Sequence, residues 1–215
     1  MSAHSLRAYV IAGALGFLAG SAGAVPPEIV GYEAHLGHVL IQGIDTPGGQ
    51  GLLPLAETEA ARAAEHSKFL VASRGKTEEV KKHAGHVIHA LDPSAERSGP
   101  GTGYGELQAA RGIIERVRLA AKAPDAPAGA AQHAKHVERA MRNVEEWSKE
   151  AVEVAKKLRT SAEPGETAAL SNRVHELTLA ILEGRDANRD GKTTWEKGEG
   201  GLKQAAEHLK LMRAG

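Results

Sequence analysis

A five-residue pattern, His-x-x-His-Val, occurs three times in this 215-residue chain. In an α-helix, residues three positions apart lie on the same face, so each pattern brings two imidazole rings together. A neutral imidazole is the commonest metal ligand in proteins, and two on one face form the smallest unit that chelates a borderline metal ion. The three copies are His35-Leu36-Gly37-His38-Val39, His83-Ala84-Gly85-His86-Val87 and His133-Ala134-Lys135-His136-Val137.

The copies recur at nearly equal intervals, with 48 residues from the first to the second and 50 from the second to the third. After each of the first two copies come an Asp, a Pro and then an Ala-Ala-Arg sequence, at 60–62 and at 109–111. Because the residue before a Pro disfavours helical backbone, each of these units is expected to be helix, loop, helix. The third unit is expected to continue as one helix to about Arg159. The repeat therefore predicts an all-α helical bundle built from tandem αα-hairpins.

The phase of the second copy places its histidines at the edge of an apolar face. At about 100° per residue, Val80, Val87 and Leu91 lie in one stripe. The histidine pair of this copy falls roughly 90° from the centre of that stripe, and His89 turns farther towards solvent. The first and third copies have the same phase. The pairs are therefore expected in helix–helix seams or on the bundle surface, where ligands from two helices can meet.

A histidine near a helix end has a simpler role, which is to hydrogen-bond a neighbouring carbonyl group. We expect that role for the lone residues His66, His175 and His208. For the repeated pairs we expect metal binding instead, because the same spacing recurs in the same phase. His89 is included with them, since it extends the second copy to H-x-x-H-x-x-H.

Two other side chains are candidates to support these sites. Glu79 lies one turn before His83 and would orient its imidazole or complete a coordination sphere. Met141 lies near the third pair and would suit Cu(I), although its place in the apolar stripe favours core packing. Imidazole-rich sites suit Cu(II), Zn(II) and Ni(II), with copper first in raw affinity. The predicted cofactor is a transition-metal ion from this group.

Residues 1–24 have the features of a secretory signal peptide: Arg7, an apolar stretch at 9–19, and Ala22-Gly23-Ala24 as a cleavage site. We therefore expect a periplasmic or secreted protein with no membrane span after cleavage. The formal net charge of zero disfavours nucleic-acid partners. The absence of cysteine excludes disulfides, c-type haem attachment, Cys-rich zinc sites and blue copper.

A helical, exported, cysteine-free chain with H-x-x-H elements resembles the small histidine-rich metal-binding proteins of the bacterial periplasm. The resemblance covers about residues 28–145 and rests on histidine spacing and export. It implies a helical bundle that binds copper and other divalent ions as a buffer or scavenger. This chain departs from that pattern because it is longer and gathers its histidines into three units.

A second candidate site lies near the C-terminus, where residues 186–194 are similar to the start of an EF-hand calcium loop. Asp186, Asn188 and Asp190 match the first three oxygen-ligand positions, Gly191 matches the sharp turn, and Thr194 falls at the ninth position. This match predicts calcium binding at the weak, extracellular end of the affinity range.

The end of the loop departs from the EF-hand pattern. Lys197 stands at position 12, where the bidentate Glu belongs, while Glu196 comes one residue earlier and Glu199 two residues later. Either glutamate is a substitute ligand, and Glu196 is included in the predicted site. Segments 170–183 and 197–212 are expected as the flanking helices. The alternative is an Asp/Asn/Gly turn that caps two helices.

The sequence thus predicts a His-rich helical repeat bundle over residues 25–160 and a helix-loop-helix packed on it over 161–215. Serine-hydrolase, zincin and Walker A motifs are absent, so we expect no enzyme. The expected function is to buffer, sequester or deliver copper, zinc or nickel. The main alternative is an envelope scaffold or chaperone-like bundle with a protein partner and structural, pH-sensing histidines. A b-type haem protein or a metal hydrolase is a weaker third possibility.

Overall fold

The structure of this protein is a computed structural model that describes residues 30–214, and the expected signal peptide at 1–24 lies outside the described residues. The described chain is all-helical, which confirms the predicted fold class. Its elements are α1 (Tyr32–Leu40), the short 3-10 helix η1 (Pro47–Gly49), α2 (Leu52–Ala72), α3 (Thr77–Leu91), α4 (Glu106–Lys122), α5 (Ala130–Thr160), α6 (Pro164–Glu183) and α7 (Leu202–Ala214).

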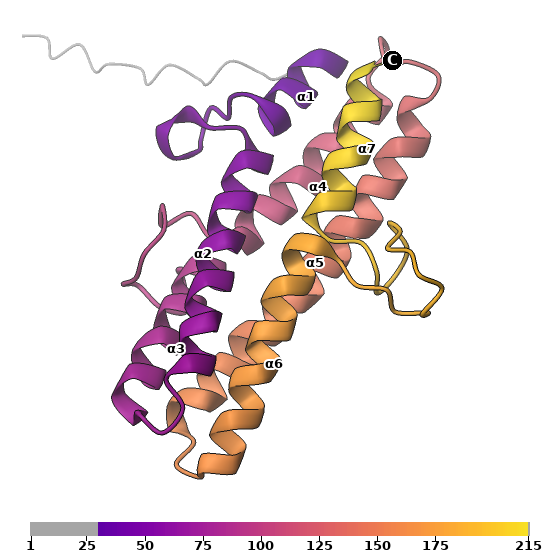
Figure 1. Cartoon of the computed structure of the whole chain (residues 1–215). Helices are drawn as coiled ribbons and strands as arrows, with labels where there is room; N and C mark the ends of the chain where they lie inside the picture. The colour runs from indigo at the N-terminus through magenta and orange to yellow at the C-terminus, as the bar shows by residue number, and fades with distance from the viewer. Residues whose placement is uncertain (1–29, 215) are drawn as a thin grey trace, which may run out of the picture.

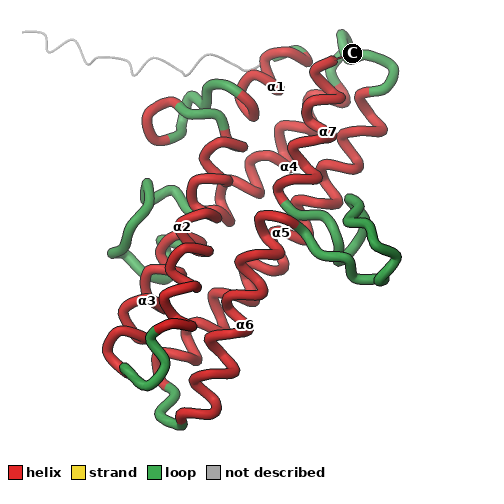
Figure 2. The backbone as a smooth tube through the Cα atoms, viewed as in Figure 1, coloured by secondary structure: helices red, strands yellow, loops and turns green. Residues whose placement is uncertain are grey.

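The helix α5 organises the bundle. It is 31 residues long and packs against α3, α4, α6 and α7 (Figures 1 and 2). Its buried positions include Val137, Met141, Val144, Ala151 and Leu158, which recur every three to seven residues along one face. This continuous apolar face explains why the third repeat unit runs on as a single helix, as the sequence predicted. Met141 is fully buried, so it serves in the core.

The helices pair differently from the expected tandem hairpins. Within the first two repeat units, α1 makes few contacts with α2, and α3 makes few with α4. Instead, α2 packs on α3 and α1 packs on α4. The loops inside the two units, at 41–51 and 92–105, are long enough to let each helix pair with one from the other unit. The pairing across units decides which side chains meet the histidine pairs.

Small side chains allow the helices to pack closely. Ala56, Ala60 and Ala63 are fully buried along one face of α2, and Ala84 is fully buried on α3. Alanine has the highest helix propensity and occupies little space, so helices that face one another through alanine approach closely. Long side chains placed at the edges of such a face are brought within reach of the neighbouring helix.

The C-terminal helices differ from their expected bounds. α6 begins at Pro164 rather than at 170, with the proline in the first turn where its missing N–H costs nothing. α7 begins at Leu202 rather than at 197. The residues before it belong to an irregular loop, 184–201, in which Gly191 and Gly198 have positive φ. Over the described residues, the structure contains no helix that is both long and apolar enough to span a membrane.

Candidate metal centres

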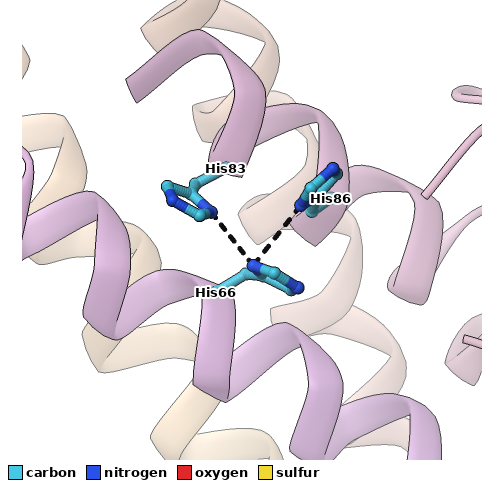
Figure 3. Close-up of side chains that lie close together, drawn as sticks. All are labelled: His66, His83 and His86. Carbon is cyan, nitrogen blue, oxygen red and sulfur yellow. Dashed lines mark hydrogen bonds between the residues drawn. The ribbon is translucent and has the colours of Figure 1, made fainter. Parts of the chain in front are cut away.

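Three histidines converge where α2 meets α3. His66 comes from α2, and His83 and His86 come from the second H-x-x-H copy on α3 (Figure 3). The Nδ1 atom of His66 lies 3.0 Å from the Nδ1 of His83 and 3.4 Å from the Nδ1 of His86. We refer to these three residues as the α2–α3 cluster.

Three more histidines converge where α5 meets α7. His133 and His136 belong to the third H-x-x-H copy on α5, and His208 comes from α7. The Nδ1 atoms of His133 and His208 are 3.1 Å apart. The Nδ1 of His136 is buried and has no hydrogen-bond partner among the described residues. We refer to these residues as the α5–α7 cluster.

The two clusters have nearly the same ring geometry. The stacked pair has a centroid distance of 5.2 Å and an interplanar angle of 26° for His66 and His83, against 5.3 Å and 29° for His208 and His133. The perpendicular pair has a centroid distance of 4.5 Å in both clusters, with angles of 72° and 67°. Within the H-x-x-H pairs, the ring centroids are 5.7 Å apart for His83 and His86 and 6.0 Å apart for His133 and His136, and both interplanar angles are 81°. The arrangement is therefore repeated.

The distances in both clusters fit a bound transition-metal ion. Zinc–imidazole bonds are about 2.0–2.1 Å long, so two nitrogens on a tetrahedral ion are roughly 3.3–3.4 Å apart. The nitrogen–nitrogen distances of 3.0, 3.1 and 3.4 Å lie close to this value. Three imidazoles also leave one position of a tetrahedral ion open for water or another ligand.

The electrostatics keep the central histidine of each cluster neutral. Burial, and then the positive charges that His86 and His83 would carry, lower the pKa of His66 to about 4. Burial and the neighbouring His136 and His133 lower the pKa of His208 to about 4 as well. Neutral imidazoles present the lone pairs that metal ions require, whereas a proton would compete for the same nitrogen. At neutral pH these two residues are therefore ready to bind a metal ion.

The local sequence explains why the histidines point into the seams. His83 and His86 each precede a fully buried residue, Ala84 and Val87. A step of one residue turns the side chain by about 100°, so each histidine lies beside the apolar stripe, as the sequence analysis expected. His66 and His208 hold the same position on their helices, immediately before the buried Ser67 and Leu209. Histidines at the margins of two facing stripes meet across the seam.

The α2–α3 cluster has a carboxylate beside it. Glu79 Oε2 lies 3.7 Å from Nε2 of His83, on the ring edge away from the cluster. A metal-bound imidazole commonly donates its other N–H to a carboxylate, which orients the ring and strengthens it as a ligand. Phe69 packs on the other side, with its ring 5.0 Å from that of His83 and 5.6 Å from that of His66. Glu79 therefore lies beside His83, and its role in supporting a metal-bound ring stays a prediction.

An indole ring covers the α5–α7 cluster. Trp195, from the 184–201 loop, stacks on His136 with a centroid distance of 3.8 Å and an angle of 10°. Asn143, two turns after His136 on α5, holds the loop in place. Its amide donates to the carbonyls of Glu196 and Gly200, and its side-chain oxygen accepts from the backbone of Gly198. The C-terminal loop is thereby fixed against this cluster.

The structure does not bring every predicted histidine into a cluster. In the described part of the chain, His35 and His38 belong to neither three-ligand group. The expectation that His89 turns towards solvent is wrong, because its side chain is buried and its Nδ1 bonds the carbonyl of Glu96 at 2.8 Å. The 92–105 loop folds back over α3, and Gly99 lies directly against His89. His89 fastens this loop.

The EF-hand-like loop is closed by hydrogen bonds among its own residues. Asp186 accepts from the backbone of Asp190 and Gly191, and Asp190 accepts from the backbone of Lys192, at 2.9–3.1 Å. Asn188 accepts from the backbone of Asp190. These bonds lie within the loop and cap neither of the flanking helices.

The glutamate beside Thr194 is Glu199, which is buried and accepts both the hydroxyl and the backbone N–H of Thr194. Glu196, the predicted ligand, is exposed. In the residues that the structure describes, three carboxylates of this loop do not gather into a metal-binding group. Calcium binding stays a prediction.

His66 and His208 each complete a cluster, and neither is among the metal ligands that the sequence predicts. As lone histidines, they are expected only to hydrogen-bond a neighbouring carbonyl group. A second repeat marks them: Ala63-Ala64-Glu65-His66-Ser67-Lys68 on α2 matches Ala205-Ala206-Glu207-His208-Leu209-Lys210 on α7. The third lone histidine, His175, is a hydrogen-bond partner, but its Nδ1 lies 2.9 Å from the hydroxyl of Ser67 on α2 and not beside a neighbouring carbonyl group.

Comparisons with known proteins add no relative. No protein-family model, curated protein or solved structure matches this chain.

Proposed function

We propose that this protein binds transition-metal ions at the α2–α3 and α5–α7 clusters, and that it buffers, sequesters or delivers them. The single observation that carries this proposal is the repeated geometry of three converging imidazoles. Two separate pairs of helices present the same ring arrangement, from two copies of each of two short sequence patterns. Packing alone gives no reason for six polar rings to adopt one arrangement twice.

The chemistry of the ligands indicates which ions bind. Three neutral imidazoles without thiolates suit Zn(II), Cu(II) and Ni(II), and raw affinity favours Cu(II). A three-coordinate site with one open position exchanges its ion more readily than a closed four-ligand structural site. An open site is what a buffer or delivery protein needs. We therefore retain the non-enzymatic role and the periplasmic or secreted location as parts of the proposal.

The alternative of a pH-sensing scaffold is less well supported. A histidine that reports physiological acidification must titrate between about pH 5 and 8. The pKa of about 4 for His66 and His208 places the titration of both residues below that window. Metal binding gives a reason for histidines to be crowded in this way. The crowding lowers their pKa values, and it also brings their unprotonated ring nitrogens close enough to bind one ion.

The first test is to count metal ions. The full-length protein is expressed without an affinity tag, freed of metal with a chelator, and titrated with Zn(II), Cu(II) and Ni(II) by calorimetry. We expect two ions per chain, and the double variants His83→Ala/His86→Ala and His133→Ala/His136→Ala should each bind one. Elemental analysis of untreated protein should find the same metals and would also detect calcium.

The matched control is His175→Gln, which alters a partly buried histidine that bonds a hydroxyl group rather than other imidazoles. This variant should still bind two ions. The proposal is wrong if the wild-type protein binds none of the three metals with a Kd below about 10 μM, or if both double variants bind as well as the parent.

A further inference from the structure

The first H-x-x-H copy also meets a second helix, although no third histidine from the described residues joins it there. His35 and His38 on α1 are 7% and 4% exposed, and the Nδ1 atoms of both rings are buried with no hydrogen-bond partner within residues 30–214. The helix that covers this face is α4, against which α1 packs. The geometry thus resembles the two clusters in one respect: a histidine pair faces a neighbouring helix across a seam.

The sequence of α4 shows which residue stands opposite. Glu65-His66-Ser67-Lys68-Phe69 on α2 and Glu207-His208-Leu209-Lys210-Leu211 on α7 are matched on α4 by Glu115-Arg116-Val117-Arg118-Leu119. The three segments also have the same burial, with an exposed glutamate, a partly buried second residue, a buried third residue and two exposed ones. In this register, Arg116 occupies the position of His66 and His208.

The surroundings of the first pair agree with this register. After burial, the positive charge of Arg116 is the next cause that lowers the pKa of both His35 and His38, so the guanidinium is near both rings. The other charged groups that act on them are Asp125 on His35, and Asp45 and the neighbouring His35 on His38. The Asp45 carboxylate lies 3.3 Å from Nε2 of His38. The α1–α4 seam therefore matches the two clusters in its histidine pair, and it has the guanidinium of Arg116 where each cluster has its third imidazole.

We infer that α1 and α4 form a third copy of the metal-binding unit in which Arg116 has replaced the third histidine, so that the site is latent. This inference rests on the proposed function of the other two clusters. A guanidinium stays protonated at any ordinary pH and offers no lone pair. It removes one ligand and adds a fixed positive charge where the cation would bind. The wild-type protein therefore binds two ions rather than three, and the substitution Arg116→His opens a third site for the same class of ion.

The test compares metal stoichiometry in wild type and Arg116→His by zinc calorimetry and elemental analysis. We expect two ions in the wild type and three in the variant. Co(II) provides an independent readout, because a third tetrahedral imidazole site should raise the visible absorption by about half. Two matched controls, Arg116→Gln and Arg118→His, should keep two ions, since the first adds no ligand and the second places a histidine on the exposed face of α4.

The outcomes separate this inference from the proposed function. Two ions in both wild type and folded Arg116→His would overturn the latent site and leave the proposed function standing. No ion in the wild type would overturn the proposed function, whereas a gain of one ion in Arg116→His would still support the latent site. If circular dichroism shows that Arg116→His does not fold, the double variant His35→Ala/His38→Ala decides. It should keep two ions, and a loss of one would overturn the inference.

Discussion

The α2–α3 and α5–α7 clusters have the same rings and different surroundings. Their centroid distances agree within 0.3 Å, as the pairs at 5.2 and 5.3 Å, 4.5 and 4.5 Å, and 5.7 and 6.0 Å show. Around the first lie the carboxylate of Glu79 and the ring of Phe69, and over the second lies the indole of Trp195. Under the proposed function, we expect the shared ring geometry to decide which kind of ion binds. We expect the different surroundings to decide how tightly each cluster holds that ion.

Glu79 gives the clearest difference. The position four residues before His83 holds Glu79, and the position four residues before His133 holds Gly129, which has no side chain. Carboxylate support for a metal-bound histidine is therefore available in the α2–α3 cluster and missing at the matching position of the other. We expect the α2–α3 cluster to fill first when metal is limiting.

The largest effect is expected from the central histidines. His66→Ala should abolish binding at the α2–α3 cluster and leave the α5–α7 cluster unchanged, and His208→Ala should do the reverse. Because the two variants alter different pairs of helices, their effects should add. Zinc calorimetry should find one ion in each single variant and none in the double variant. Loss of both ions in either single variant would show that the clusters are not independent.

The thermal stability of the metal-free protein should depend on pH because the pKa values of His66 and His208 are lowered in the folded state. His66 and His208 titrate at about 4 when folded and near 6.5 when unfolded, so the unfolded chain binds more protons between these values. The stability that they contribute is complete above pH 6.5 and is lost as the pH falls towards 4. Thermal melts should show a decrease of roughly 5–10 °C over this range, beyond that of a His66→Gln/His208→Gln variant.

The pH dependence of the thermal melts also tests whether the two clusters are equivalent. The single variants His66→Gln and His208→Gln should each remove about half of the extra pH dependence, because their pKa values are lowered to the same extent. A pH profile that is the same in the wild type and in the double variant would contradict the crowding of the rings.

Glu79→Gln should sharpen the difference between the clusters. Removing the carboxylate that supports His83 should weaken metal binding at the α2–α3 cluster by about 10-fold, the low end of the usual range because Glu79 is half exposed. The α5–α7 cluster should be unaffected, so the two binding steps should move closer together in a titration. The control is Glu78→Gln, an exposed neighbour that pairs with Lys81. Equal weakening by both variants would mean that only the net charge matters.

The fold class and two of the three histidines of each cluster could be predicted from the sequence because they depend on local spacing. The three-residue interval of His83 and His86 puts them on one helical face whatever the rest of the chain does. The apolar period likewise predicts one long helix for the third repeat unit, which the structure has as α5. Glu79 could be found in the same way, since it lies one turn before His83.

The third ligand of each site could not be predicted in this way. His66 and His208 reach their clusters through packing between helices, and His208 lies 75 residues along the chain from His133. A hairpin expectation pairs α3 with α4, whereas the structure pairs α3 with α2. Spacing within one helix says nothing about which helix packs beside it. The Ala-Ala-Glu-His-x-Lys repeat was the only sequence signal that marked these two residues as equivalent.

The smallest effect on affinity is expected at Trp195. Because its ring stacks on His136 at 3.8 Å, a paramagnetic Cu(II) ion in the α5–α7 cluster should quench its fluorescence. Trp195→Phe keeps an aromatic ring there, so its Kd should change by no more than about threefold while most of the quenching disappears. His208→Ala should also remove the quenching, and His66→Ala should preserve it. Equal quenching in the two histidine variants would place copper elsewhere. The pattern expected here makes Trp195 an optical reporter for one cluster alone, so that the filling of two sites with nearly identical geometry can be followed separately.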